Sequence, residues 1–478
     1  MKRIQKSTLA LLGVREVVVK HLITTVFLAI AFTLTTAYSQ GCECPNAKPC
    51  AKSCPKACPK SSAGANTAND GFFIKDNDRV VFLGDSITQQ RLYTTYIEAY
   101  ALTRFPEYKL TFRNTGWNRD TAWLRKRCWT DEVKLFAATG ETLDKIVAES
   151  VSKGLERDVL PLKPTVVTVN FGMNDHGYEA FRPDRFRVYQ RSQEEIVRTL
   201  KKNGARIALL TPQPIEDVKQ GLNKDPRNQS LRKFSDGLKE IAAAEGAEFV
   251  DQFDPYMEII SKRSEGQAAT IGEGDPVHPG PCGHTVMAWA ILKELQAPAL
   301  VSSVFVDTSV KGDNALTKKM VMENCTVSNV SYKDGVLAFD RLDHALPMPI
   351  DRRALNALNL ASISCDLNRY LVCVKGLADG QYDVLIDGKS VVTITSKAGK
   401  AFTNLAKVAT PASAQADKLL ALVFKKNDVY LNRWRNVQLK GGNAAALAGL
   451  DKQIADFEKQ INELRKPSRH HFEIKPLE

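Results

Sequence analysis

The stretch VVFLGDSITQQ, residues 80–90, gives the first indication of the fold of this 478-residue chain. Four apolar residues run into Gly84, Asp85 and Ser86, and a helical pattern without a further glycine follows. A buried strand that ends in a turn-permissive residue and continues as a helix presents the next side chains at the carboxyl edge of a sheet. We therefore expect Ser86 at such an edge, although Gly-Asp-Ser is also an ordinary turn sequence.

Up to about residue 300, short β-branched runs alternate with amphipathic helical stretches. The runs are RVVFLG (79–84), KLTFRNTG (109–116), TVVTVNFG (165–172), RIALLTP (206–212) and AEFVDQ (247–252). Strands that alternate with helices form crossover units in a mainly parallel sheet that is covered on both faces. The pattern predicts an α/β fold, a flavodoxin-like three-layer α/β/α sandwich over residues 71–300.

The region 301–478 has a different pattern. Its segment RYLVCVKGLADGQYDVLIDGKSVVTI alternates apolar and polar residues around Asp379-Gly380 and Asp387-Gly388, which predicts antiparallel β-hairpins. Two helices are expected next, and the second carries one apolar stripe of Leu447, Leu450, Ile454, Phe457, Ile461 and Leu464. The stripe is shorter than three heptads, which favours docking on the same chain over a coiled-coil dimer.

The composition is that of a soluble globular protein, with 44% hydrophobic and 25% charged residues. The net charge of +12 favours an acidic wall or polysaccharide as a partner. Aromatic residues are not interleaved with the basic ones as on a nucleic-acid surface, so we expect no nucleic-acid partner.

The first 39 residues have the pattern of a signal peptide. A basic start precedes an apolar run at 22–37, and Ala37 and Ser39 suit cleavage, so we expect export to the periplasm, the cell envelope or the exterior. An uncleaved membrane anchor and a lipoprotein modified at Cys42 are the alternatives. Residues 40–70, rich in cysteine, proline and lysine, are expected to form a linker whose thiols form disulfides of open pairing.

Three further segments supply what a nucleophilic serine needs, namely a base and oxyanion donors. The run ending in FGMND places Gly172 and Asn174 at the expected sheet edge, and RNTGWNRDT offers backbone N–H groups beside Gly116. In GDPVHPG, Asp275 stands three residues before His278. This spacing lets one short loop present a base together with the carboxylate that orients it.

The ordered blocks GDSIT, NTGWNRDT, GMND and DPVH resemble those of the SGNH or GDSL-type hydrolases, a family of esterases and acylhydrolases. The resemblance covers about residues 71–300, and the region after it resembles tails of long bacterial members. It implies Ser86 as nucleophile, His278 as general base and then acid, and Asp275 as its orienting partner. It also implies an oxyanion hole of the Ser86 N–H, the Arg119 N–H and the Asn174 amide. No metal or organic cofactor is required.

One residue departs from this family's pattern. The second block usually has glycine where this chain has Arg119. Arginine keeps a backbone N–H, but it loses easy access to positive φ and adds a bulky cation. Either the Arg119 N–H still donates to the oxyanion, and the Arg119 side chain also binds an acidic substrate, or the oxyanion hole is impaired. Survival of this donor is favoured, because removing one donor of several lowers the rate without abolishing it.

Other polar residues near the blocks are secondary candidates. The candidates for lining the pocket are Asp85, Gly116, Gly172 and Asp175. Asp175 and the adjacent His176 are nevertheless expected to be solvated loop residues. Asp343-His344 is a rival acid–base pair in the C-terminal region and is disfavoured for that reason. Two cysteines are expected to be buried or bridged rather than catalytic: Cys128 and Cys282.

Together these features predict an exported serine hydrolase that cleaves carboxylic esters through an acyl-enzyme. No long apolar lid is evident, which favours short acetyl groups on a polysaccharide over long-chain lipids. The alternative is a catalytically impaired protein of the same fold that binds glycan or cell wall, motivated by Arg119. The acyl group, the alcohol and the oligomeric state stay open.

Overall fold

The computed structural model describes residues 71–217, 221–262, 270–271, 273–310 and 313–477. These residues belong to one compact unit. The predicted signal peptide, the linker with its cysteines and the lipidation candidate Cys42 lie outside the described residues. Within the described ranges, no helix has the length and apolar character needed to cross a membrane.

A five-stranded parallel sheet organises the N-terminal half. Its strands are β1 (Arg79–Gly84), β2 (Thr111–Asn114), β3 (Val166–Asn170), β4 (Arg206–Leu210) and β5 (Glu248–Val250). They lie in the order β2-β1-β3-β4-β5, with Phe82 opposite Asn114 and Gly84 opposite Asn170. This is the flavodoxin-like order, in which the carboxyl strand ends form a crevice at the switch point. The predicted α/β class is confirmed.

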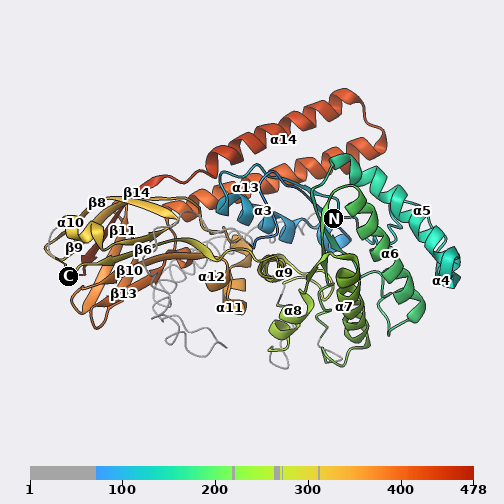
Figure 1. Cartoon of the computed structure of the whole chain (residues 1–478), viewed down its shortest axis with the longest axis horizontal. Helices are drawn as coiled ribbons and strands as arrows, with labels where there is room; N and C mark the ends of the chain where they lie inside the picture. Colours follow the sequence, from blue (N-terminus) through green and yellow to red (C-terminus); the bar gives the residue numbers. More distant parts are fainter. Residues whose placement is uncertain (1–70, 218–220, 263–269, 272, 311–312, 478) are drawn as a thin grey trace, which may run out of the picture. The chain divides into compact units, whose positions relative to one another are not determined.

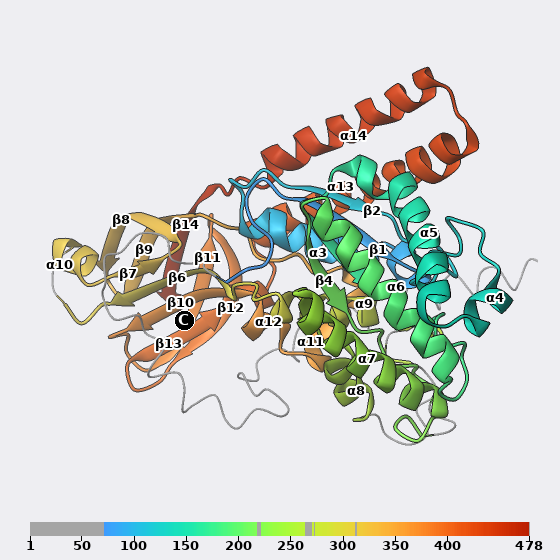
Figure 2. The same cartoon turned by 45° about the vertical axis from the view of Figure 1, so that its right-hand side comes forward.

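Helices cover both faces of this sheet (Figure 2). One hydrophobic core contains α5 (Gly140–Asp158), α6 (Pro183–Lys202) and one side of α7 (Pro226–Glu245). The opposite core contains α3 (Leu92–Arg104), α8 (Phe253–Ile260) and α9 (Pro281–Glu294). Shorter helices are α2 (Ser86–Gln89), α4 (Glu132–Ala137) and the 3-10 turn Leu160–Leu162.

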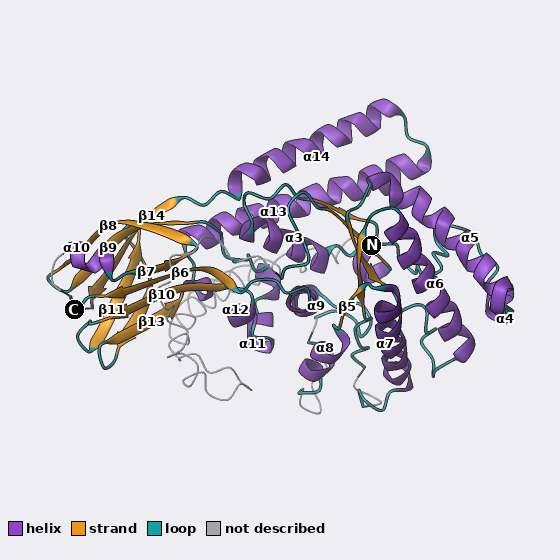
Figure 3. Cartoon of the chain, viewed as in Figure 1, coloured by secondary structure: helices purple, strands orange, loops and turns teal. Residues whose placement is uncertain are grey.

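Two further sheets form a sandwich in the C-terminal region, where strands gather in Figure 3. One has the order β13 (Lys400–Asn404), β10 (Arg369–Lys375), β6 (Leu300–Asp307) and β7 (Val321–Glu323). The other has the order β12 (Lys389–Ser396), β11 (Gly380–Ile386), β14 (Arg469–Pro476), β9 (Val336–Asp343) and β8 (Cys325–Lys333). Apolar side chains from both sheets share one core, which includes Val304, Val372, Phe339 and Phe472.

The hairpin prediction is right at one Asp-Gly pair and wrong at the other. Asp387 and Gly388 connect β11 to β12 with φ angles of 51° and 74°, as a primed turn requires. Asp379-Gly380 joins strands of different sheets, because β10 pairs with β6 and β13 while β11 pairs with β12 and β14. Strand β14, which completes the second sheet, is not among the predicted strands.

Short helices and turns complete the C-terminal region. They are α10 (Asp313–Lys318), α11 (Ala357–Leu360), α12 (Ile363–Asp366) and the 3-10 turns Arg352–Ala354, Leu405–Lys407 and Gln438–Lys440. Two long helices, α13 (Pro411–Leu431) and α14 (Ala444–Leu464), pack side by side (Figure 1). A π-helical turn, Asn432–Val437, extends α13.

The C-terminal helices dock on the parallel-sheet region, as predicted for the apolar stripe. Ile461 of α14 joins the core that contains α3 and α9, and Ile454 packs with Tyr430 and Trp434. Lys426 of α13 forms a buried ion pair with Glu98 of α3. Residues before and after position 300 contribute to one hydrophobic core. The domain boundary predicted near residue 300 therefore stays a prediction.

Candidate active site

Ser86 stands at the carboxyl end of β1. The strand ends at Gly84, and Asp85 caps the following helix by accepting the Ile87 N–H at 3.0 Å. Ser86 is the first residue of that helix, α2. The buried strand ends at its last apolar residue and the turn that follows it. The serine comes directly after this turn and therefore lies at the edge of the sheet.

The loop segment just before α9, which follows α8 in the chain, brings an imidazole and a carboxylate to this serine. The Ser86 Oγ lies 3.0 Å from Nε2 of His278, and Nδ1 of His278 lies 3.0 Å from Oδ2 of Asp275. The other carboxylate oxygen accepts the N–H groups of Val277 and His278, each at 2.8 Å. Partial burial raises the pKa of Asp275, but these N–H donors and the imidazole outweigh it and hold the pKa below its usual value.

The loop is fixed by contacts that need a glycine at its base. The Glu216 N–H donates to the Pro276 carbonyl at 2.8 Å, and Nε2 of Gln213 donates to the Val277 carbonyl at 3.0 Å. A Cβ atom on Gly274 would lie 2.0 Å from the His278 carbonyl oxygen. Only glycine permits this approach, so Gly274 allows the loop to fold back and present the imidazole.

Asn174 follows the end of β3 and is held in one orientation. Its Nδ2 donates to the Asp120 carbonyl at 2.9 Å, and its Oδ1 accepts the Tyr178 hydroxyl at 3.1 Å. An amide nitrogen carries two hydrogens, so one donor remains beyond the bond to Asp120. Asn174 lines the same cavity as Ser86 and His278, where that hydrogen is available to an oxyanion.

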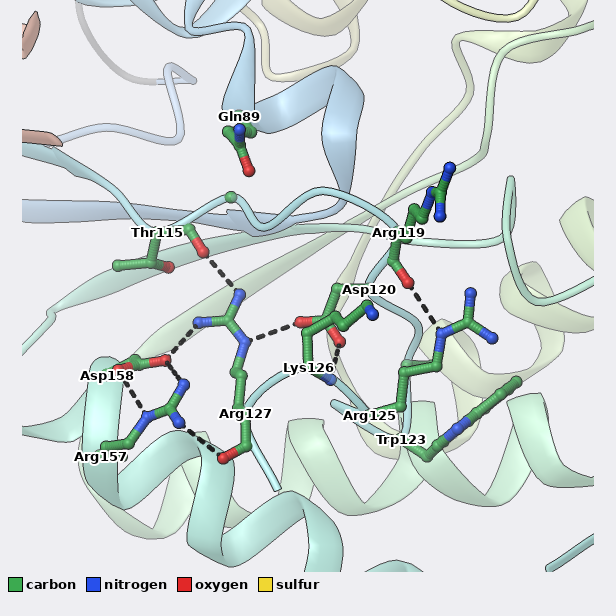
Figure 4. A network of polar contacts seen from close by, with 12 residues as sticks. Gln89, Thr115, Arg119, Asp120, Trp123, Arg125, Lys126, Arg127, Arg157 and Asp158 are labelled. Carbon is green, nitrogen blue, oxygen red and sulfur yellow. Dashed lines mark hydrogen bonds and ion pairs between the residues drawn. The ribbon is translucent and has the colours of Figure 1, made fainter. Parts of the chain in front are cut away.

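Arg119 adopts a backbone conformation with positive φ, although the arginine in place of glycine made this conformation doubtful from the sequence. Its φ is 60°, the left-handed region that glycine occupies without strain. Nε of Arg125 donates to the Arg119 carbonyl at 2.8 Å, and this contact is visible in Figure 4. The structure therefore keeps the turn of the second block despite the arginine.

A buried guanidinium anchors this loop to helix α5 (Figure 4). Arg127 lies between two carboxylates, with Nε 2.8 Å from Asp120 and Nη1 3.0 Å from Asp158, and none of the three side chains is exposed. Its Nη2 also donates to the Thr115 carbonyl. These bonds fix both ends of the second block, from Thr115 to Asp120.

Several predicted pocket residues lie beneath the site instead. Asp175 is buried and accepts the N–H groups of Ala122 at 2.8 Å and Gly172 at 2.9 Å. Burial raises the pKa of Asp175 to about 7 and that of Asp85 to about 8. His176 is also buried, which lowers its pKa to about 4. The expectation of solvated loop residues is wrong for Asp175 and His176, because tertiary packing closes over them.

The cavity at the site has a volume of about 380 Å³. It is lined by Ser86, Asn118, Arg119, Arg125, Asn174, Tyr178 and His278. Its described lining includes none of the predicted candidates Asp85, Gly116, Gly172 and Asp175, which are buried. Asn118, Arg125 and Tyr178 were not predicted. Arg125 and Tyr178 follow the second and third blocks closely, but no residue pattern distinguishes them from ordinary loop residues.

The C-terminal region reaches this site through the π-helical turn. The guanidinium of Arg435 lies 3.5 Å from the ring centroid of Trp117, and its Nη1 is 3.4 Å from both the Gly116 carbonyl and Oε1 of Gln89. A Cβ on Gly116 would lie 2.3 Å from the Gln89 nitrogen, so the second block packs directly on α2. Arg435 thus contacts the loop that carries Arg119, which the sequence alone did not indicate.

The other candidates lie away from the cavity. Asp343 is buried beside Arg341, while His344 is exposed. The two residues of the rival acid–base pair therefore do not form a site together. Cys282 is buried and Cys128 partly exposed, and neither is bridged. Burial raises the pKa of the Cys282 thiol to about 12. In the part of the chain that is described, no group of three or more His, Cys, Asp or Glu side chains could hold a metal ion.

Known proteins match both the sequence and the fold. Residues 82–286 match the model of the GDSL-like lipase/acylhydrolase family. An acetylxylan esterase from Geobacillus stearothermophilus is 24% identical over 243 residues, which are 46% of this chain and 95% of the esterase. A crystal structure of that esterase covers 46% of this chain and 95% of its own, with 23% identity and a TM-score of 0.36.

A second solved structure extends over most of the chain. It is that of a gut microbial diltiazem-metabolizing enzyme, with 23% identity and a TM-score of 0.68. The match covers 86% of this chain and all of that enzyme, so the same fold includes the C-terminal sheets and helices. The family match includes the segment that carries Ser86 and Asn174, and it supports an SGNH/GDSL-type hydrolase domain within residues 82–286.

Proposed function

We propose that this protein is a serine hydrolase that cleaves carboxylic esters through an acyl-enzyme. The observation that carries the proposal is the chain of contacts from Ser86 Oγ through His278 to Asp275 at the wall of a cavity. An alcohol, an imidazole and a carboxylate in this order form the arrangement that activates a serine.

Each of these residues has one role in the proposed reaction. Nε2 of His278 takes the proton as Ser86 Oγ attacks the ester carbonyl, and Asp275 stabilises the imidazolium that forms. The free amide hydrogen of Asn174 and the backbone N–H groups of Ser86 and Arg119 donate to the oxyanion. His278 then protonates the leaving alcohol, and water releases the acyl group by the same steps in reverse.

The proposed substrate is a short acyl ester, an acetyl group on a polysaccharide. The cavity of about 380 Å³ lies near the lower end of the range for small-molecule sites, and each of its described lining residues carries a polar group in its side chain. The similarity to a relative named acetylxylan esterase supports the same substrate class. The sequence pattern of residues 1–39 supports an exported enzyme, which would meet polysaccharide outside the cytoplasm.

Labelling with a fluorophosphonate probe tests the mechanism. We expect covalent labelling of the full chain, no labelling of Ser86→Ala, and a fall in esterase kcat of at least about 10³-fold in that variant. Ser390→Ala, which changes a serine of β12 far from the blocks in sequence, is the matched control and should be labelled like the natural chain. Absence of labelling in folded protein would favour the alternative, a glycan-binding protein with an impaired oxyanion hole.

The substrate class is tested separately from the mechanism. A series of nitrophenyl esters, assayed together with acetylated xylan, should show the highest kcat/KM for acyl chains of about two to four carbons. A preference for chains of about eight carbons or more would contradict the acetyl assignment. The roles of Ser86 and His278 would still stand in that case.

A further inference from the structure

We propose that Arg119 and Arg125 form a subsite for an anionic group, a carboxylate or a sulfate, on the sugar whose ester is cleaved at Ser86. This inference rests on the proposed ester hydrolase and names the charge of its substrate. The sugar units that fit are uronic acids or sulfated sugars of an O-acylated polysaccharide.

The two guanidinium groups belong to the wall of the reaction cavity. Both residues line it together with Ser86 and His278, and no carboxylate is among its described lining residues. They come from one loop and are tied together, because Nε of Arg125 donates to the Arg119 carbonyl (Figure 4). An anion that entered the cavity would therefore meet two cations held close to the nucleophile.

Both side chains retain donors for a ligand. Within the described ranges, the guanidinium of Arg119 makes no hydrogen bond or ion pair, and the residue is exposed. Arg125 uses Nη1 for an ion pair with Glu132 at 3.1 Å and Nε for the Arg119 carbonyl. Since a guanidinium has five N–H donors, Nη2 of Arg125 remains for a ligand oxygen. Paired N–H donors match the geometry of carboxylate and sulfate oxygens.

The acidic residues around the cavity do not cancel this positive charge. Asp120 is paired with Arg127, and Asp275 contacts the His278 ring. Burial raises the pKa of Asp85 to about 8 and of Asp175 to about 7, so these carboxyls carry reduced negative charge near neutral pH. Among the described residues, Glu132 is the acid that pairs with a lining arginine, and it leaves Arg119 uncompensated.

The backbone of Arg119 gives an independent reason to assign it a role. Arg119 has φ of 60°, a left-handed conformation that is unfavourable for a residue other than glycine. Such conformations persist where the surrounding structure imposes them, and they concentrate at functional sites. An arginine kept in this conformation at the cavity wall is consistent with a side chain that contacts the substrate.

The test compares two pairs of esters, each with one charged and one neutral member. One pair is an O-acetylated methyl galacturonoside and its C6 primary amide, and the other is an O-acetylated methyl galactoside with and without a 6-sulfate. We expect kcat/KM to be about tenfold higher for at least one charged member at low salt. The ratio of kcat/KM between the charged and the neutral member should fall toward one at about 0.5 M NaCl, because salt screens exposed charges. The pair with the larger ratio identifies carboxylate or sulfate as the group.

Variants assign the effect to the two arginines. Arg119→Gln and Arg125→Gln should each lower the charged-to-neutral ratio of kcat/KM at least about threefold, and this ratio is the readout whatever either variant does to the rate for the neutral amide. Arg191→Gln, which changes an exposed arginine of α6 that does not line the cavity, is the matched control. Equal rates for the charged and neutral members in the natural chain, or ratios unchanged in both variants, would overturn the subsite.

A binding measurement separates this inference from the proposed reaction. Calorimetric titration of Ser86→Ala with the same four compounds should show tighter binding of the charged member, by a factor that Arg119→Gln reduces. If labelling and hydrolysis both fail while this preference persists, the hydrolase proposal fails and the anion subsite stands. If hydrolysis succeeds and neither binding nor kcat/KM depends on charge, the subsite fails and the hydrolase stands.

Discussion

Two clusters of buried polar side chains, one in each half of the molecule, differ in how their charges are compensated. Between the C-terminal sheets, Arg341 bonds Asp343 at 2.7 Å, and the same carboxylate accepts from Ser302 and Tyr370. Every charge in this cluster meets an opposite charge or a hydroxyl. It is a closed network, and its residues lie in the sandwich away from the cavity.

The cluster under the cavity lacks such pairing. Asp85 and Asp175 accept backbone N–H groups, and neither forms an ion pair within the described residues. Their pKa values are raised mainly by burial, so ionisation is unfavourable there. We infer that the C-terminal cluster stabilises its sheets, whereas the cluster at the sheet edge shapes the loops of the candidate active site at a cost in stability.

The largest expected effect comes from breaking the paired cluster. Arg341→Met leaves Asp343 buried without its cation, and we expect the free energy of unfolding to fall by about 3–5 kcal/mol. Urea denaturation measures the loss. The double variant Arg341→Met/Asp343→Asn removes the orphaned charge and should recover a large part of it. A loss below about 1 kcal/mol in the single variant would show that the pair does not hold the sandwich.

Neutralising a carboxyl group in the unpaired cluster should have the opposite effect and raise the free energy of unfolding. The pKa of Asp85 is about 8 in the folded protein and 3.8 in its ordinary state, so folding favours the protonated form. The unfolded chain releases this proton above pH 4, and the free energy of unfolding therefore falls as the pH rises toward 8. Asp85→Asn keeps the helix cap and cannot ionise, so at pH 8 it should be more stable by on the order of 2 kcal/mol.

The pH dependence identifies the cause of that gain. The advantage of Asp85→Asn should shrink as the pH is lowered and vanish below about pH 3, where Asp85 is largely protonated in both states. Thermal unfolding at several pH values measures it. A constant difference between pH 4 and 8 would mean that the substitution acts through packing and that the carboxyl is not strained by its burial.

The smallest effect is expected where the two halves meet at the active site. Arg435→Ala removes the stacking on Trp117 and the contact with the Gly116 carbonyl. We expect kcat to fall about fivefold, equivalent to roughly 1 kcal/mol, because the loop of Arg119 is less well positioned, with KM little changed. Arg433→Ala is the matched control, since Arg433 lies in the same π-helical turn and pairs with Asp451. Equal effects of both variants would indicate general destabilisation.

Much of the fold could be predicted because it depends on local pattern. The five β-branched runs each contain a strand, and the alternation with helices required a parallel sheet. The Asp387-Gly388 hairpin and the docked stripe on α14 also follow from short-range rules. Strand β14 could not be placed in this way, since its partners, β9 and β11, lie far away in sequence.

Local pattern was enough to predict that Ser86, Asn174 and the Asp275–His278 loop follow strand ends or precede a helix, and parallel strands bring such positions to one edge. Three features required the packed molecule: the left-handed backbone of Arg119, the burial of Asp175 and His176, and the contact of Arg435 with the second block. The reason is physical: hydrophobic periodicity fixes elements locally, whereas burial and loop conformation depend on which distant surfaces pack together.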